Sequence, residues 1–150
     1  MIKKFTSFVK ENIDIYKFKI KKVEDTFSLL GYFDGDLAGR IDITILSDAY
    51  TYEFVDIMSE DKYDSIFETR NVAHLENLVV DEYYQNSGLG KKLIELAFKE
   101  LKRRNIKEIY LNAYPKGKGL DLTDLVEFYK KSGFNIILNQ GGNVLMYSKI

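Results

Sequence analysis

The first third of the chain alternates between apolar and polar residues, which is the pattern of half-buried strands. It predicts three strands, over residues 15–23, 26–33 and 37–46. Asp34-Gly35-Asp36, between the second and third strands, is a tight-turn signal, so this part is expected to form an antiparallel meander. Residues 1–14 fit either one helical face or a frayed leader.

In the second half of the chain the apolar period changes from two residues to about 3.6. Leu93, Ala97 and Leu101 recur at helical spacing and predict a helix over residues 89–103. A second helix, over residues 123–131, is expected to stop at Gly133. The remaining apolar runs predict strands over residues 73–80, 106–113, 134–138 and 143–148. This order of elements predicts an α/β domain with a mixed sheet.

Residues 47–71, between the meander and the strand predicted over residues 73–80, have the least regular pattern. Residues 50–57 fit another strand, and residues 59–70 fit a short helix with Ser59 as its N-cap. Because function often lies on irregular connections, this segment is expected to face a substrate. Its acidic side chains favour either a cationic ligand or a solvated charged loop: Asp48, Glu53, Asp56, Glu60 and Asp61.

The composition limits the class of protein. With 150 residues, 45% of them hydrophobic, and one proline, the sequence predicts one compact domain. It has no cysteine, which excludes disulfides, thiolate metal sites and a cysteine nucleophile. No apolar run approaches the ~18 residues of a membrane span, and the N-terminus lacks the apolar stretch of a signal peptide, so a cytoplasmic protein is expected. The formal net charge of -1 disfavours nucleic acid as the main partner.

The strongest functional signal follows the strand predicted over residues 73–80. It is the run Gln85-Asn86-Ser87-Gly88-Leu89-Gly90-Lys91, which opens the first predicted helix. In this order, unpaired amide groups and the positive end of the helix dipole face a ligand, and glycines allow the main chain to approach it closely. The run therefore predicts a phosphate site. Lys91 and Lys92 either add charge there or are solvated surface lysines.

The spacing excludes three familiar glycine motifs. Gln85 and Lys92 stand where a Walker A motif needs glycine and serine or threonine. Leu93 stands where a dinucleotide fingerprint needs its third glycine. Ser87 lacks the flanking glycines of a nucleophile elbow.

What remains, Val80, Tyr84, Gln85, Gly88 and Gly90, resembles the acyl-coenzyme A loop of the GNAT superfamily of N-acetyltransferases. Residues 125–134, LVEFYKKSGF, are similar to the family's A-x-x-F-Y-x-x-x-G-F segment. The chain departs from the family pattern at Glu82, where proline is common, at Leu125, where a small residue is usual, and at Leu122, where asparagine is frequent. The resemblance covers residues 73–148. It implies a single GNAT-like domain over residues 1–150, with a mostly antiparallel sheet of about seven strands and helices on both faces.

The resemblance also implies a chemistry. Acetyl-coenzyme A is the expected cosubstrate, no metal is needed, and the acetyl group passes to a primary amine that attacks the thioester directly. The amine belongs to a small molecule, a protein or a peptide. Coenzyme A is expected to bind at Leu78, Val79, Val80, Gln85, Asn86, Ser87, Gly88, Leu89, Gly90 and Lys91. The alternative is a non-catalytic acyl-coenzyme A sensor on the same fold.

The resemblance places Tyr129 at the position of the family's tyrosine, so Tyr129 is the candidate acid for the leaving thiolate; the alternative is a buried aromatic residue on an apolar helix stripe. Glu76 is the candidate base. On a regular strand it shares a face with His74, Leu78 and Val80, and the alternative is a glutamate that is paired with a cation or faces solvent. His74 is the second candidate base. A homodimer paired through the final strand, at residues 144–147, is a further option.

Overall fold

The computed structural model describes residues 15–115 and 121–150. The alternatives for residues 1–14 lie outside this range. The chain forms two compact units. The first unit comprises the described part of residues 1–44 together with residues 75–100, and the second comprises residues 45–74 with the described part of residues 101–150. The prediction of a single domain over residues 1–150 stays a prediction.

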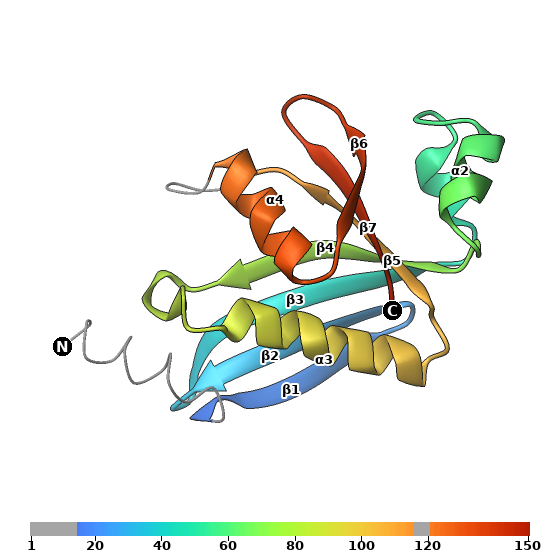
Figure 1. Cartoon of the computed structure of the whole chain (residues 1–150). Coiled ribbons are helices and arrows are strands. Elements are labelled where there is room, and N and C mark those ends of the chain that lie inside the picture. The colour runs from blue at the N-terminus through green and yellow to red at the C-terminus, as the bar shows by residue number, and fades with distance from the viewer. Residues whose placement is uncertain (1–14, 116–120) are drawn as a thin grey trace. The chain divides into compact units, whose positions relative to one another are not determined.

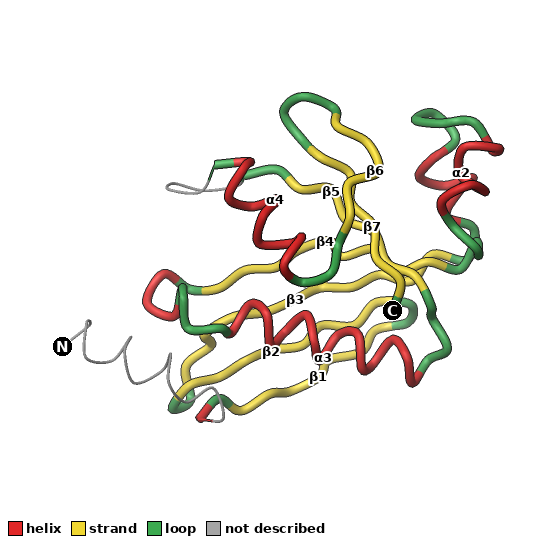
Figure 2. The backbone as a smooth tube through the Cα atoms, in the orientation of Figure 1, coloured by secondary structure: helices red, strands yellow, loops and turns green. Residues whose placement is uncertain are grey.

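Seven strands hydrogen-bond in the order β1-β2-β3-β4-β5-β7-β6 (Figures 1 and 2). Their bounds are β1 Lys17–Val23, β2 Thr26–Phe33, β3 Asp36–Leu46, β4 Val72–Val80, β5 Glu108–Ala113, β6 Asn135–Asn139 and β7 Val144–Lys149. β4 and β5 pair in parallel, whereas β1–β2, β2–β3, β5–β7 and β6–β7 are antiparallel. This confirms the expected α/β fold with a mixed, mostly antiparallel sheet.

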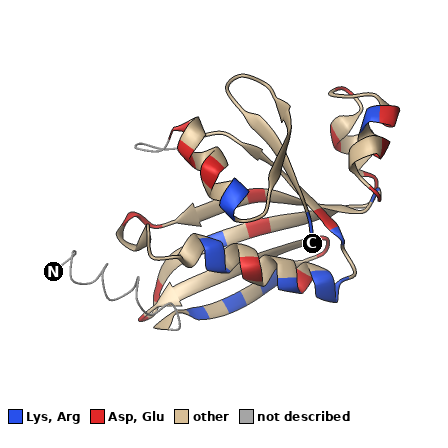
Figure 3. Ribbon diagram, in the orientation of Figure 1, with Lys and Arg blue, Asp and Glu red and all other residues tan. Residues whose placement is uncertain are grey.

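The first unit contains the predicted meander and most of helix α3 (Leu89–Arg103), whose bounds match the prediction. Asp34 and Gly35 both have positive φ angles, 49° and 85°, as a two-residue hairpin turn between β2 and β3 requires. β1 stands at the edge of the sheet and carries four exposed lysines (Figure 3), which discourage pairing with another strand: Lys17, Lys19, Lys21 and Lys22.

Two glycines allow α3 to pack closely on the meander. Gly31 and Gly39 pair directly across β2 and β3. A Cβ atom on Gly31 would lie 3.1 Å from Cδ1 of Leu89, the first residue of α3. A Cβ atom on Gly39 would lie 3.1 Å from Cδ2 of Leu89 and 3.0 Å from the carbonyl oxygen of Val79. The missing side chains therefore leave the space that Leu89 fills, and Leu89 itself is buried.

In the second unit, the prediction of a strand over residues 50–57 is wrong. The chain forms the π-helix η2 (Tyr50–Phe54) instead. The Asp48 carboxylate accepts hydrogen bonds from the Thr51 amide (3.3 Å) and hydroxyl (2.8 Å), which favours a turn at this point over an extended chain. Phe54 is fully buried while Tyr52 is 72% exposed, although a strand would place both on one face.

Helix α2 (Glu60–Ile66) begins as predicted, because Ser59 Oγ accepts a hydrogen bond from the Lys62 amide at 3.1 Å. It ends before Arg70, where the prediction placed its end. The cause is the buried Glu108 carboxylate at the start of β5, which accepts the backbone amides of Glu68 (3.0 Å) and Thr69 (2.8 Å). These amides are therefore unavailable to the helix. The Tyr147 hydroxyl of β7 donates to the same carboxylate.

The last elements of the second unit lie within a few residues of their predicted bounds. Helix α4 (Leu122–Lys131) packs against β5 and is followed by Gly133 at a φ of 104°. β7 is hydrogen-bonded on both sides, by β5 and by β6. It therefore has no free edge, and the predicted pairing of this strand across a dimer is wrong.

The close packing of Leu89 on Gly31 and Gly39 predicts an effect on stability. Gly39→Ala places a Cβ atom against the Val79 carbonyl and the Leu89 and Leu93 side chains, so we expect the free energy of unfolding to fall by about 1–3 kcal/mol. Gly142→Ala is the matched control, because nothing lies within 4 Å of its new Cβ atom. Urea unfolding followed by circular dichroism measures both. Equal stability of the two variants would contradict close packing at Gly39.

Candidate functional site

The predicted phosphate loop, residues 85–90, connects the 3-10 helix η3 (Glu82–Tyr84) to α3 in the first unit. Asn86 and Gly88 have positive φ angles, 64° and 85°, which turn the main chain sharply before the helix. A Cβ atom on Gly88 would meet no atom within 4 Å. The space beside the Gly88 backbone is therefore open.

The buried Ser87 side chain stabilises the loop by hydrogen bonds. It is 3% exposed, and its hydroxyl donates to the Tyr84 carbonyl at 2.5 Å. The same oxygen accepts the Leu89 amide and the Tyr16 hydroxyl, each at 3.3 Å. Burial raises the pKa of Tyr16, so its phenol stays neutral and continues to donate. The Ser87 side chain is thus committed to the loop, and only its backbone can contact a ligand.

The backbone amides of the loop differ in availability. Those of Gln85 and Leu89 already donate within the protein, to the Glu82 carbonyl (3.5 Å) and to Ser87 Oγ (3.3 Å). Within the described ranges, five other amides of this segment donate to no acceptor: those of Asn86, Ser87, Gly88, Gly90 and Lys91. The amides at the start of a helix have no intrahelical partner, so these groups form a set of donors suited to an anion.

The end of β4 is tied to the loop. The Gln85 side-chain amide donates to the Val80 carbonyl at 3.3 Å, and the Asp81 amide donates to the Ala38 carbonyl of β3 at 2.8 Å. Val79 is 54% exposed, whereas Leu78 and Val80 are half-buried. Lys91 is exposed. The structure thus brings the end of β4 and the 85–90 loop together.

Glu76 is exposed and accepts a hydrogen bond from the Thr44 hydroxyl at 2.6 Å. Its neighbour Asn77 donates to Asp42 at 3.3 Å. Thr44 and Asp42 lie two residues apart on β3 and share a face, whereas consecutive residues of a regular strand point to opposite faces. The alternation of β4 is therefore interrupted here, and the expectation that Glu76 shares a face with Leu78 and Val80 does not follow from simple alternation.

Tyr129 lies on α4 in the second unit and is 7% exposed. Its ring packs against those of Phe128 and Phe134, with centroids 5.3 and 5.7 Å away. Burial raises the pKa of Tyr129 to about 12. The phenol therefore remains protonated at neutral pH. A general acid needs this state, but a buried aromatic residue without a catalytic role has it too, so protonation does not decide between the two.

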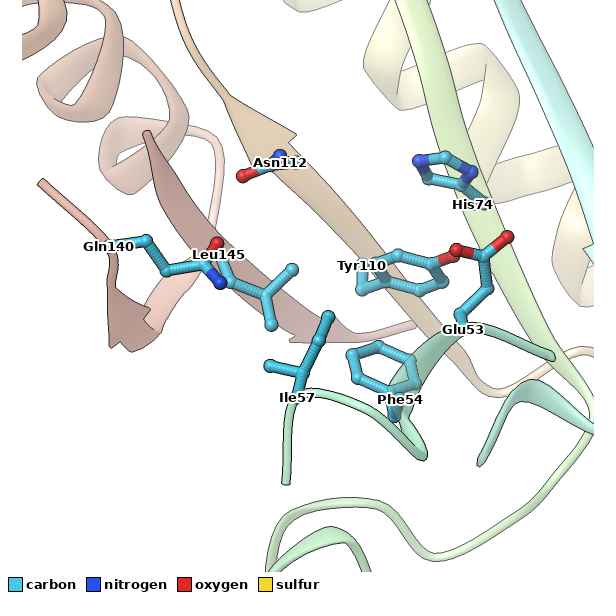
Figure 4. A pocket seen from close by; sticks show the side chains of 8 residues that line it. All are labelled: Glu53, Phe54, Ile57, His74, Tyr110, Asn112, Gln140 and Leu145. Atoms are coloured by element: carbon cyan, nitrogen blue, oxygen red, sulfur yellow. The ribbon is translucent and has the colours of Figure 1, made fainter. Parts of the chain in front are cut away.

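The second unit also contains a pocket of about 130 Å³ that the sequence reasoning did not locate (Figure 4). Its wall includes His74, which stacks on Tyr110 with ring centroids 4.5 Å apart. Tyr110 and Asn112 lie two residues apart on β5 and therefore share a face of the strand. This spacing was the available sequence signal for the pocket. The lining consists of Glu53, Phe54, Ile57, His74, Tyr110, Asn112, Gln140 and Leu145. Glu76, the first candidate base, is not among these residues.

No group of three or more His, Asp or Glu side chains in the described ranges is arranged to hold a metal ion. Among the helices that the structure describes, none has the length and apolar character of a membrane span.

Known proteins share this fold. The structure is similar to the PaiA N-acetyltransferase from Thermoplasma acidophilum in complex with coenzyme A, with 22% identity, a TM-score of 0.58, and 84% of this chain and 62% of that chain covered. It is also similar to a GNAT family acetyltransferase from Elizabethkingia anophelis with acetyl-CoA bound, with 12% identity, a TM-score of 0.62, and 91% and 99% covered. A third similar structure is the aminoglycoside 6'-acetyltransferase type Ii, with 20% identity, a TM-score of 0.56, and 83% and 69% covered.

At these identities the similarity shows the fold, and the chain spans less than two thirds of the T. acidophilum protein. The sequence itself matches the model of the acetyltransferase (GNAT) family over residues 4–134. Because this match extends over most of the chain, and because the strand order and the open glycine loop agree with it, the protein belongs to the GNAT acetyltransferase family.

Proposed function

We propose that the protein is an acetyl-coenzyme A-dependent N-acetyltransferase that acts on a primary amine. The observation that supports this most directly is the 85–90 loop, where the backbone at Gly88 is open and several amides have no acceptor within the described part of the chain. The similar structures from T. acidophilum and E. anophelis contain coenzyme A and acetyl-CoA, respectively. A cytoplasmic location belongs to the same proposal.

The loop amides and Lys91 are proposed to bind the coenzyme A diphosphate. The positive end of the α3 dipole favours an anion at this point, and charge-assisted hydrogen bonds from amides are stronger than neutral ones. The pantetheine arm is proposed to lie along Leu78, Val79 and Val80, where its amides pair like an added strand. A backbone amide of Val79 or Val80 then polarises the thioester carbonyl.

In the proposed reaction the amine nitrogen attacks the thioester carbonyl carbon, so that a C–N bond forms and the C–S bond breaks. The base removes a proton from the amine, and the leaving thiolate takes up a proton from that base or from solvent to end as a thiol. Full proton transfer from a phenol of pKa about 12 to a thiolate, whose acid has a pKa of ~8.5, would cost about 5 kcal/mol. We therefore assign Tyr129 mainly a hydrogen bond to the sulfur as negative charge develops on it.

Glu76 remains the first candidate base, and its hydrogen bond with Thr44 orients its carboxylate. His74 is the second, supported by its place in the wall of the pocket. The remaining alternative, a non-catalytic acyl-coenzyme A sensor, would bind the cosubstrate without releasing free thiol.

The proposal predicts that isothermal titration calorimetry detects acetyl-coenzyme A binding. Gly88→Trp should abolish it by filling the open space at the loop, and Lys91→Glu, an exposed change, should weaken it by roughly tenfold by opposing the diphosphate charge. Gly141→Trp is the control, because Gly141 also has a positive φ (92°) and open space beside it, and it lies outside the loop. Absence of binding by the wild-type protein at millimolar acetyl-coenzyme A would rule out the proposed function.

Thiol release with a panel of amines tests the catalytic assignments. Tyr129→Phe removes the donor to the sulfur and should lower kcat by no more than about 10²–10⁴-fold, with little change in acetyl-coenzyme A affinity. Glu76→Gln and His74→Gln identify the base, because only loss of the true base abolishes the low-pH limb of the kcat/KM profile. If kcat is unchanged in Tyr129→Phe, Tyr129 has no catalytic role and is a structural residue only.

Burial of Tyr129 also predicts a pH dependence of stability. Its folded pKa of about 12 exceeds the ordinary value of about 10, so its contribution is complete below pH 10 and is lost as the pH rises toward 12. Between pH 8 and pH 11 the loss from this group approaches about 1.4 kcal/mol. Urea unfolding at both pH values should therefore show a smaller loss in Tyr129→Phe than in wild type. Tyr52→Phe, which removes an exposed phenol, should match wild type.

A further inference from the structure

The pocket of the second unit is small. Its volume of about 130 Å³ is close to the ~150 Å³ of an engineered apolar cavity that holds a benzene molecule. It therefore has room for one compact group of about six non-hydrogen atoms. A larger ligand can place only one end in it.

The lining carries charge of one sign. It contains the Glu53 carboxylate and neither lysine nor arginine. Acidic side chains cluster on η2 and α2 (Figure 3), but several are already bound. Arg70 lies 3.7, 3.4 and 3.6 Å from the carboxylates of Asp48, Glu60 and Asp64, respectively. The Glu53 carboxylate, in contrast, forms no hydrogen bond or ion pair with a residue in the described ranges.

Asn112 adds an acceptor without a donor. Its Oδ1 atom is buried and has no hydrogen-bond partner among the residues that the structure describes. A buried acceptor left unpaired costs about 1–3 kcal/mol, so a second N–H group of a ligand, separate from the group that meets Glu53, would be stabilising here. In Figure 4 the amides of Asn112 and Gln140 lie toward one end of the pocket, and Glu53 and His74 lie toward the other.

Apolar and aromatic groups form the rest of the wall. The rings of Phe54 and Tyr110 meet edge to face with centroids 4.8 Å apart, and His74 stacks on Tyr110. Phe54 is fully buried, and its ring also packs on Phe67 at 5.1 Å, next to the residues that Glu108 holds. The wall is therefore preformed. Aromatic faces and ring edges accept an alkyl or aryl body, and the faces also attract a cation.

We propose that this pocket binds the acceptor of the acetyl group by its amine-bearing end, and that it selects a compact primary ammonium on an alkyl or aryl body. Glu53 is the residue that determines this specificity: its carboxylate pairs with the ammonium and repels acceptors that carry a carboxylate beside the amine. The inference rests on the proposed function for the identity of the ligand as acceptor. The same chemistry is offered by a free alkylamine and by the end of a lysine side chain.

Binding to the chain of 150 residues, without acetyl-coenzyme A, tests the inference by titration calorimetry and saturation-transfer NMR. The probes are n-pentylamine, n-pentanol and pentanoate, which share a size and differ in the polar group. We expect pentylamine to bind most tightly and pentanoate not to bind. Glu53→Gln should weaken pentylamine by about five- to tenfold and remove its advantage over pentanol. Asp56→Asn, an exposed change on the same segment outside the lining, should have no effect.

Equal binding of pentylamine and pentanol by wild type, or equal pentylamine binding by Glu53→Gln and wild type, would overturn the inference. If amines are acetylated but Glu53→Gln leaves their KM unchanged, the inference fails and the proposed function stands. If pentylamine binds through Glu53 but acetyl-coenzyme A neither binds nor reacts, the proposed function fails, and with it the identity of the ligand as acceptor. Comparison of pentylamine with a lysine blocked at both its α-amino and carboxyl groups then distinguishes a free amine from a protein side chain.

Discussion

In the second unit, one buried carboxylate fixes the path of the chain after α2. Glu108 is 1% exposed and accepts hydrogen bonds from the Glu68 amide, the Thr69 amide and hydroxyl, and the Tyr147 hydroxyl. A charge removed from water costs several kcal/mol unless donors replace the lost water, and here they surround it. The same bonds fix the chain after α2 against β5 and β7. Phe67, next to these bonds, packs on Phe54, so the carboxylate also holds one wall of the pocket in place.

The two candidate binding regions are built differently. The 85–90 loop presents main-chain groups, and its side chains either brace the turn, as Ser87 does, or fill the space above Gly31 and Gly39, as Leu89 does. The pocket presents side chains, and its character changes with each residue in its wall. Under the two proposals made above, the cosubstrate meets mainly backbone and the acceptor meets side chains, so substitutions in the pocket change the acceptor preference without changing the loop.

Local chemistry explains which elements the sequence predicted. The Asp34-Gly35 turn, the Ser59 cap and the Gly88 start of α3 each satisfy a backbone requirement within a few residues, so the pattern places them well. The π-helix η2 was missed because its apolar residues satisfy a strand pattern. The Asp48 bonds to Thr51 and the core around Phe54 together decide against a strand. The end of α2 depends on Glu108, about 40 residues further along the chain, and one side of β7 pairs with β5, about 30–40 residues before it. Periodicity reports neither partner.

The turn of the 85–90 loop was predictable, because the sequence places a glycine where the main chain adopts a positive φ before α3. The pocket was not, because Glu53, His74, Asn112 and Gln140 come from four separate elements or connections and share no motif. For Asn112 the sequence offers only its spacing from Tyr110 on β5, which does not reveal what surrounds the side chain. Its importance is visible only once its oxygen is seen to be buried without a partner in the described structure.

The paired glycines under Leu89 have a consequence for how the loop responds to ionic conditions. The contact is between a hydrocarbon side chain and bare backbone, so dissolved ions screen nothing there. Attraction between a diphosphate and the helix end, in contrast, weakens as salt is added. High salt should therefore release an anionic ligand from the 85–90 loop without changing the conformation of the loop. The conformation that binds the anion thus does not depend on the anion.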